Sequence, residues 1–193
     1  MLPNAYRSEQ NTSCMDLYIL RHGKAEDAGN GITDAERKLT KKGREEMTAV
    51  VEWMAAQDLV FDLIATSPLA RASETAEIVA EGLGMPKKPK VWKVLVPGGN
   101  PDDVCREIDG HDGAGALLLV GHEPLLSSLI SRIIAGDEHA GIAMTKGALA
   151  KIRNYSFSGR PSGELHWLIT AKQMGGAGHH PKKPGLATHA FIH

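Results

Sequence analysis

The chain has 193 residues, a formal net charge of −1 at pH 7 and a pI of about 6.8. Apolar residues make up 42% of it and charged residues 23%, a balance that excludes a disordered chain. The charge balance lacks the basic excess of a nucleic-acid-binding protein, and no apolar stretch is long enough to span a membrane. With two cysteines and no targeting pattern, the sequence predicts one cytoplasmic domain without disulfides or structural metal.

Strand and helix patterns alternate along the chain. Short apolar runs predict strands at 17–20, 61–66, 91–95 and 116–120. Apolar residues at helical spacing predict helices at 41–54, 69–81, 102–108 and 125–133, the first capped by Thr40. Residues 147–153 and 164–170 are predicted to pair as a hairpin. This alternation predicts an α/β fold, a three-layer α/β/α sandwich with a mostly parallel central sheet.

The two ends of the chain differ from its middle. Residues 1–14 are polar and aperiodic, and from 174 onward the composition is rich in Gly, His, Pro and Lys. The sequence therefore predicts a loose N-terminal extension over 1–14, one domain over 15–173 and a C-terminal tail over 174–193. Translation from Met1 or from Met15 is left open. The tail histidines show no regular metal-ligand spacing, so no metal is expected there.

Two of the predicted strands run directly into a histidine. Arg21 and His22 follow the strand at 17–20, and Gly121 and His122 follow the strand at 116–120. Because ligands bind at the carboxyl ends of parallel strands, the two histidines are expected to face each other across one crevice. Arginine matches phosphate oxygens with a fork of donors, and a neutral histidine is a nucleophile. Together with Arg71, these side chains predict a phosphate pocket that needs no metal.

Four segments in order resemble the histidine phosphatase superfamily, whose phosphoglycerate mutase and acid phosphatase branches share an Arg-His-Gly signature after the first strand. The matching segments are Leu20-Arg21-His22-Gly23, Leu39-Thr40-Lys41-Lys42-Gly43, Ser67-Pro68-Leu69-Ala70-Arg71-Ala72-Ser73-Glu74-Thr75-Ala76 and Val120-Gly121-His122-Glu123-Pro124. The resemblance implies a phosphoglycerate mutase-like fold and a metal-independent phosphatase without a cofactor. It also implies that His22 carries the transferred phosphoryl group, that Arg21 and Arg71 clamp it, and that His122 completes the pocket.

Three further residues are candidates for this site. Gly23 is expected to let the backbone approach the pocket closely. Ser67 is expected to bind the phosphate or, in the interpretation that we favour, to cap the helix that follows it. Glu123 is either a proton donor or a carboxylate that is stabilised by the start of the next helix.

Within the superfamily, the chain looks most like the small SixA-type phosphohistidine phosphatases. It is short, lacks large cap insertions and carries the loop Leu95-Val96-Pro97-Gly98-Gly99-Asn100-Pro101. Mutases and many phosphomonoesterases of this superfamily have a glutamate acid near this point, whereas no acidic residue lies between Lys90 and Pro101. A phosphoramidate nitrogen leaves more readily than an alkoxide without an acid.

These observations predict a monomeric phosphohistidine phosphatase. Its expected partner is a phosphorylated protein such as a histidine phosphotransfer domain, with no nucleic acid and no membrane. One alternative is a phosphomonoesterase acting on a small phosphorylated metabolite, with Glu123, Glu26 or Asp27 as proton donor. Another is a non-catalytic phosphate- or partner-binding module. A relay, in which His22 passes the phosphoryl group to a second acceptor, also stays open.

Overall fold

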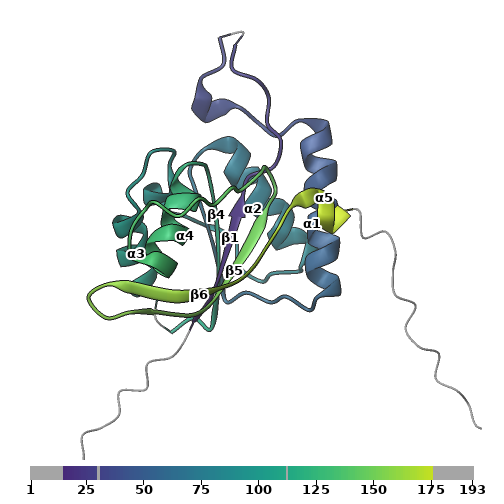
Figure 1. The fold of residues 1–193 in the computed structure, drawn as a ribbon. Helices are drawn as coiled ribbons and strands as arrows, with labels where there is room; N and C mark the ends of the chain where they lie inside the picture. Colours follow the sequence, from purple (N-terminus) through teal and green to yellow (C-terminus); the bar gives the residue numbers. More distant parts are fainter. Residues whose placement is uncertain (1–14, 30, 112, 176–193) are drawn as a thin grey trace, which may run out of the picture.

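The computed structural model describes residues 15–29, 31–111 and 113–175, and its centre is a sheet of six strands (Figure 1). The strands are β1 (Met15–Arg21), β2 (Leu63–Thr66), β3 (Lys90–Val91), β4 (Ala116–Gly121), β5 (Leu149–Phe157) and β6 (Pro161–Ile169). Their order in the sheet is β3-β2-β4-β1-β5-β6. The pairs from β3 to β1 are parallel, and β5 pairs antiparallel with both β1 and β6. The predicted mostly parallel α/β fold is therefore confirmed.

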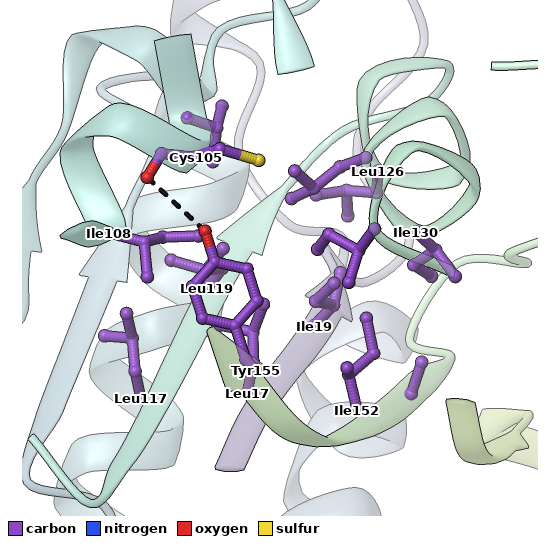
Figure 2. Packing of buried hydrophobic residues seen from close by; sticks show 14 of the residues in the cluster. Leu17, Ile19, Cys105, Ile108, Leu117, Leu119, Leu126, Ile130, Ile152 and Tyr155 are labelled. Atoms are coloured by element: carbon purple, nitrogen blue, oxygen red, sulfur yellow. Dashed lines mark hydrogen bonds between the residues drawn. The ribbon is translucent and has the colours of Figure 1, made fainter. Parts of the chain in front are cut away.

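Helices cover both faces of the sheet. They are α1 (Lys41–Ala56), α2 (Ala70–Gly82), α3 (Pro101–Asp109), α4 (Leu125–Ala135) and α5 (Ala171–Gly175), with short 3-10 helices at Asp34–Glu36 and Lys93–Leu95. Successive residues of β1 and β4 point to opposite faces, so one strand supplies both cores. Leu17 and Ile19 pack with α3 and α4, whereas Tyr18 and Leu20 pack with α1 and α2. The α3/α4 core is drawn in Figure 2, where the Tyr155 hydroxyl reaches the carbonyl of Cys105.

The predicted strand at 91–95 is mostly wrong. Only Lys90 and Val91 pair with β2, and residues 93–95 form a 3-10 helix. Trp92 and Leu95 are both buried, and a spacing of three residues places them on the same side of a 3-10 helix but not of a strand. The predicted hairpin is confirmed, but its strands continue to Phe157 and from Pro161, so its loop is shorter than the composition indicated.

The predicted domain division stays a prediction, since residues 1–14 and 176–193 lie outside the described residues. Helix α5 includes Met174 and Gly175, which the sequence analysis had placed in the tail. Met174 is buried and packs in the core beneath α1. The last described helix therefore continues two residues beyond the boundary predicted at 173.

Candidate active site

The rings of His22 and His122 face each other at the carboxyl ends of β1 and β4. Their centroids are 4.9 Å apart, and the ring planes are inclined by 54°. The parallel register pairs Arg21 with Gly121, so each histidine follows its strand at the same level of the sheet. Arg71, in the first turn of α2, places its Nε 3.3 Å from His22 Nε2. The structure thus brings together His22, His122 and Arg71, which are separate in the sequence.

The hydrogen bond of His22 defines its tautomer. Its Nδ1 lies 2.7 Å from the carbonyl oxygen of Gly23, which can only accept, so Nδ1 carries the proton. The lone pair is therefore on Nε2, the atom that faces Arg71. Burial, the largest cause, and the charges of Arg71, Arg21 and Lys146 together lower the pKa of His22 to about 4, although its hydrogen bond to the Gly23 carbonyl acts in the opposite direction. At neutral pH the ring is uncharged, and its electron pair at Nε2 accepts the hydrogen bond from Arg71 Nε.

His122 is held from a different side. Its Nε2 lies 2.9 Å from Ser67 Oγ, and its buried Nδ1 has no partner among the described residues. Burial, the largest cause, and the neighbouring His22 and Arg71 together lower the pKa of His122 to about 3. Ser67 is fully buried and precedes α2 by more than one position, because the residue that caps this helix is Leu69. The prediction that Ser67 caps α2 is therefore wrong, although its hydroxyl accepts from the N–H of Leu69 at 3.4 Å as well as contacting His122.

Arg21 is fixed by the segment that leads into β5. Its Nη1 donates to the carbonyl of Met144 at 2.7 Å, and its buried Nε has no partner among the described residues. The backbone N–H of Gly147 donates to the carbonyls of Arg21 and His22 at 3.1 and 3.2 Å. Burial lowers the pKa of Arg21, and the nearby Glu123 carboxylate partly opposes this shift.

Asp34 is a residue of this site that the sequence analysis missed. Its backbone carbonyl accepts from Arg71 Nη1 at 2.6 Å, and its carboxylate accepts from Arg71 Nη2 at 3.0 Å. The same carboxylate accepts from Arg37 at 2.7 Å, and these two guanidinium groups hold the pKa of Asp34 below its usual range. The ionised carboxylate of Asp34 is therefore paired with Arg71, the arginine that faces His22. In the sequence, the one sign that Asp34 pairs with an arginine is that it is an aspartate three positions before Arg37.

Two glycines explain why the loop after β1 fits against α1. A Cβ on Gly23 would lie 2.7 Å from Met47 Cγ, and one on Gly43 would lie 2.0 Å from the carbonyl oxygen of Lys24. Gly23 therefore allows close packing on α1, and its N–H donates to Thr75 Oγ1 at 3.2 Å. Gly23 thus packs closely against α1 and α2, and its expected role in the phosphate pocket stays a prediction.

Helix α2 is tied to the same loop by two further side chains. Thr75 Oγ1, which accepts from Gly23, donates to the carbonyl of Arg71 at 2.7 Å. Glu74 accepts from the N–H of Leu39 at 2.8 Å and pairs with Arg44 at 2.7 Å. Because these bonds link the loop, α1 and α2, they fix the helix turn that carries Arg71. The sequence analysis did not single out either residue.

The remaining acidic candidates lie at the edge of the site. One oxygen of the half-buried Glu123 accepts from the N–H of Ser127 at 3.1 Å, the arrangement expected of a carboxylate at a helix start. Glu26 is exposed and accepts from the N–H of Lys38 within the loop, and Asp27 is exposed as well. Among the described residues, neither histidine of the site is hydrogen-bonded to one of these carboxylates.

In the part of the chain that the structure describes, no group of three or more His, Cys, Asp or Glu side chains could hold a metal ion. Over the same residues, no helix is long and apolar enough to cross a membrane. The tail histidines and Cys14 lie outside the described residues.

Comparison with known proteins agrees with this geometry. Residues 17–95 match the model of the histidine phosphatase superfamily (branch 1). The chain is 33% identical over 142 residues to an uncharacterized protein of Picosynechococcus, covering 72% of this chain and 86% of that protein. The chain belongs to the histidine phosphatase superfamily, and its enzymatic class is that of a phosphatase.

Within that superfamily, the chain is similar to the phosphohistidine phosphatases called SixA. It is 29% identical to phosphohistidine phosphatase SixA of Escherichia coli K12 over 125 residues, 64% of this chain and 76% of that protein. The structure of the protein histidine phosphatase SixA complexed with tungstate superposes with a TM-score of 0.71 at 26% identity. The superposition covers 81% of this chain and 97% of the other.

Proposed function

We propose that this protein is a phosphohistidine phosphatase that transfers the phosphoryl group of a phosphorylated protein histidine to His22 and then to water. The observation that carries the proposal is the state of His22, a neutral ring with its lone pair at Nε2 beside the guanidinium of Arg71. A nucleophile in this state needs no proton removed before it attacks. The similarity to SixA supports the choice of a phosphohistidine substrate.

The first step is an exchange of one nitrogen–phosphorus bond for another. His22 Nε2 attacks phosphorus as the bond to the substrate imidazole breaks, and the electron pair of that bond stays on the departing nitrogen. With the other ring nitrogen of the substrate histidine already protonated, the leaving group is a neutral imidazole that takes up no further proton. Arg71 and Arg21 would donate hydrogen bonds to the phosphoryl oxygens, where charge is concentrated in the transition state. The buried Arg21 Nε and His122 Nδ1, unpartnered among the described residues, are available for the same oxygens.

In the second step, water attacks the phosphoryl group on His22. The bond between phosphorus and Nε2 breaks, its electron pair returns to Nε2, and the water proton leaves with the inorganic phosphate. The hydrogen bond from Nδ1 to the Gly23 carbonyl keeps the ring in one orientation through both steps.

The leaving group decides between phosphohistidine and phosphate esters. An alkoxide needs a protonated acid beside it, whereas an imidazole leaves without one. Asp34 has a lowered pKa and accepts hydrogen bonds from two arginines, so it stays ionised and is a poor proton donor. Glu123 contacts a helix N–H. These contacts favour a phosphohistidine substrate over the phosphomonoesterase alternative, and the expected cytoplasmic location and monomeric state stay predictions.

The test compares three substrates: a phosphohistidine peptide, a phosphoserine peptide of the same sequence and an aryl phosphate. We expect kcat/KM for phosphohistidine to exceed that for phosphoserine by about a thousandfold or more, since the ester lacks acid assistance worth roughly 10²–10⁴-fold. Equal or faster ester hydrolysis that is lost in Glu123→Gln would instead establish the phosphomonoesterase. Binding without turnover of any substrate would leave the non-catalytic module, and transfer to an added histidine peptide faster than to water would establish the relay.

A further inference from the structure

A cavity of about 700 Å³ lies next to the candidate site, between the start of α1, the segment before β5 and α5. Figure 1 shows α5 lying beside α1, and the two helices are in contact. Three lysines line this cavity, one from each of these elements: Lys42, Lys146 and Lys172. All three are exposed. The single acidic side chain among the lining residues is Glu46.

The segment from Met144 to Gly147 connects this cavity to the histidine pair. Its carbonyl at Met144 accepts from Arg21, and its N–H at Gly147 donates to the carbonyls of Arg21 and His22. Gly147 has a φ of +73°, and a Cβ there would lie 2.9 Å from Ala171 Cβ. Lys146 is therefore held between the candidate site and α5. Its positive charge also contributes to the lowered pKa of His22, which places it within electrostatic reach of the ring.

The charge of the cavity is unbalanced. Lys42 approaches Glu46 at 3.8 Å, whereas neither Lys146 nor Lys172 has a carboxylate within 4.0 Å among the described residues. A second cavity, of about 450 Å³ between α2 and β3, provides a contrast. There Lys87 and Lys88 are accompanied by Glu77 and Glu81. Of these two cavities, the one between α1 and α5 has a surplus of positive charge, which is complementary to an acidic partner.

We propose that the cavity lined by Lys42, Lys146 and Lys172 binds acidic side chains of the phosphorylated protein whose phosphohistidine reaches His22. The proposal rests on the proposed function and specifies its substrate as a protein with acidic residues around the phosphorylated histidine. An extended chain advances about 3.3 Å per residue, so acidic residues two to four positions away lie roughly 7–13 Å from the phosphohistidine. A metabolite whose single phosphoryl group is its only anionic group has no second charge for the lysines.

The test uses three synthetic phosphohistidine peptides of equal length, in which the residues two to four positions from the phosphohistidine are all Glu, all Ser or all Lys. Their kcat/KM is measured for the native chain, for Lys172→Glu and for the control Lys88→Glu in the balanced cavity. Both lysines are exposed, so neither change should disturb folding, which a thermal melt checks. Hydrolysis of the Ser peptide reports on the chemistry alone.

We expect the native chain to prefer the Glu peptide over the Ser peptide by about tenfold, and the preference to weaken with added salt. Lys172→Glu should reduce the preference to about twofold or less without changing the rate on the Ser peptide, while Lys88→Glu keeps it. Equal rates on all three peptides, or equal losses in the two variants, would overturn the docking proposal and leave the phosphatase standing. If no peptide is hydrolysed, the proposed function itself fails. A loss in Lys172→Glu that is confined to a small bisphosphate would assign the lysines to a metabolite instead.

Discussion

His22 and His122 follow adjacent parallel strands and face each other, but their ring nitrogens are held by different groups. His22 uses Nδ1 to bond its neighbour's carbonyl and presents Nε2 to Arg71. His122 uses Nε2 to contact Ser67, and its Nδ1 has no partner among the described residues. A carbonyl fixes a tautomer because it can only accept, whereas a hydroxyl can donate or accept. The structure thus distinguishes a histidine with a defined lone pair from one whose proton can be on either nitrogen.

The largest expected difference between the two histidines is in covalent chemistry. His22→Ala should lower kcat on a phosphohistidine peptide by about a thousandfold or more and abolish any phosphorylated enzyme, because the nucleophile is gone. His122→Ala should lower kcat by about a hundredfold, the usual cost of one lost transition-state donor, and still allow His22 to be phosphorylated. Rapid-quench trapping of acid-labile phosphate on the enzyme measures both effects.

The exposed His166 provides the control for that comparison, since His166→Ala should leave both the rate and the trapped phosphate unchanged. If phosphate were trapped on the His22→Ala variant but not on the His122→Ala variant, His122 and not His22 would be the nucleophile.

The next effect concerns pH. If the pKa of His22 is about 4, about 90% of the ring is neutral at pH 5, whereas an ordinary pKa of 6.5 would leave about 3% neutral. We therefore expect kcat/KM on the phosphohistidine peptide with flanking Ser residues, corrected for spontaneous hydrolysis, to change less than twofold between pH 7 and pH 5. A fall of about 25-fold over that range, as an ordinary pKa of 6.5 would give, would contradict the lowered pKa.

The same burial has a cost for stability in acid. Both histidines have folded-state pKa values below 6.5, so from about pH 6.5 down to about pH 4 the unfolded chain binds protons that the folded chain does not. Stability should therefore fall as pH decreases through this window, by up to about 1.4 kcal/mol per pH unit for each histidine. Urea unfolding at each pH verifies that the rate is measured on folded protein.

A smaller effect is expected where a hydroxyl orients the second histidine. Ser67→Ala removes the group 2.9 Å from His122 Nε2 and leaves a buried nitrogen without its partner. We expect about a tenfold loss of kcat and about 1–3 kcal/mol of stability, with phosphorylation of His22 retained. Ser73→Ala is the matched control, because that hydroxyl donates to the carbonyl of Ser67 and, among the described residues, has no contact with His122. Equal losses in the two variants would show that the effect is structural and does not act through His122.

The strands and helices were predictable because their apolar periodicity reflects one buried face, as in β1 and α1. The meeting of His22 and His122 was also predictable, since both directly follow strands of a parallel sheet. The contact between Asp34 and Arg71 could not be predicted. Asp34 lies in the long loop after β1, 37 positions from Arg71, and this loop has no apolar periodicity that would place its side chains. The orientation of Ser67 depended on the distance between two strand ends, which residue spacing does not give.

Asp34 carries the smallest of the expected effects. Asp34→Asn keeps an oxygen that can accept from Arg71 but removes the charge that opposes an incoming anion. The guanidinium then has one less competitor, so inorganic phosphate should inhibit about three- to tenfold more strongly, as expected for a partly exposed charge pair. Glu36→Gln is the matched control, because Glu36 lies in the same 3-10 helix and bonds Thr33. Unchanged inhibition in Asp34→Asn would mean that this carboxylate only holds the loop, whereas stronger inhibition would mean that it helps to release the product from Arg71.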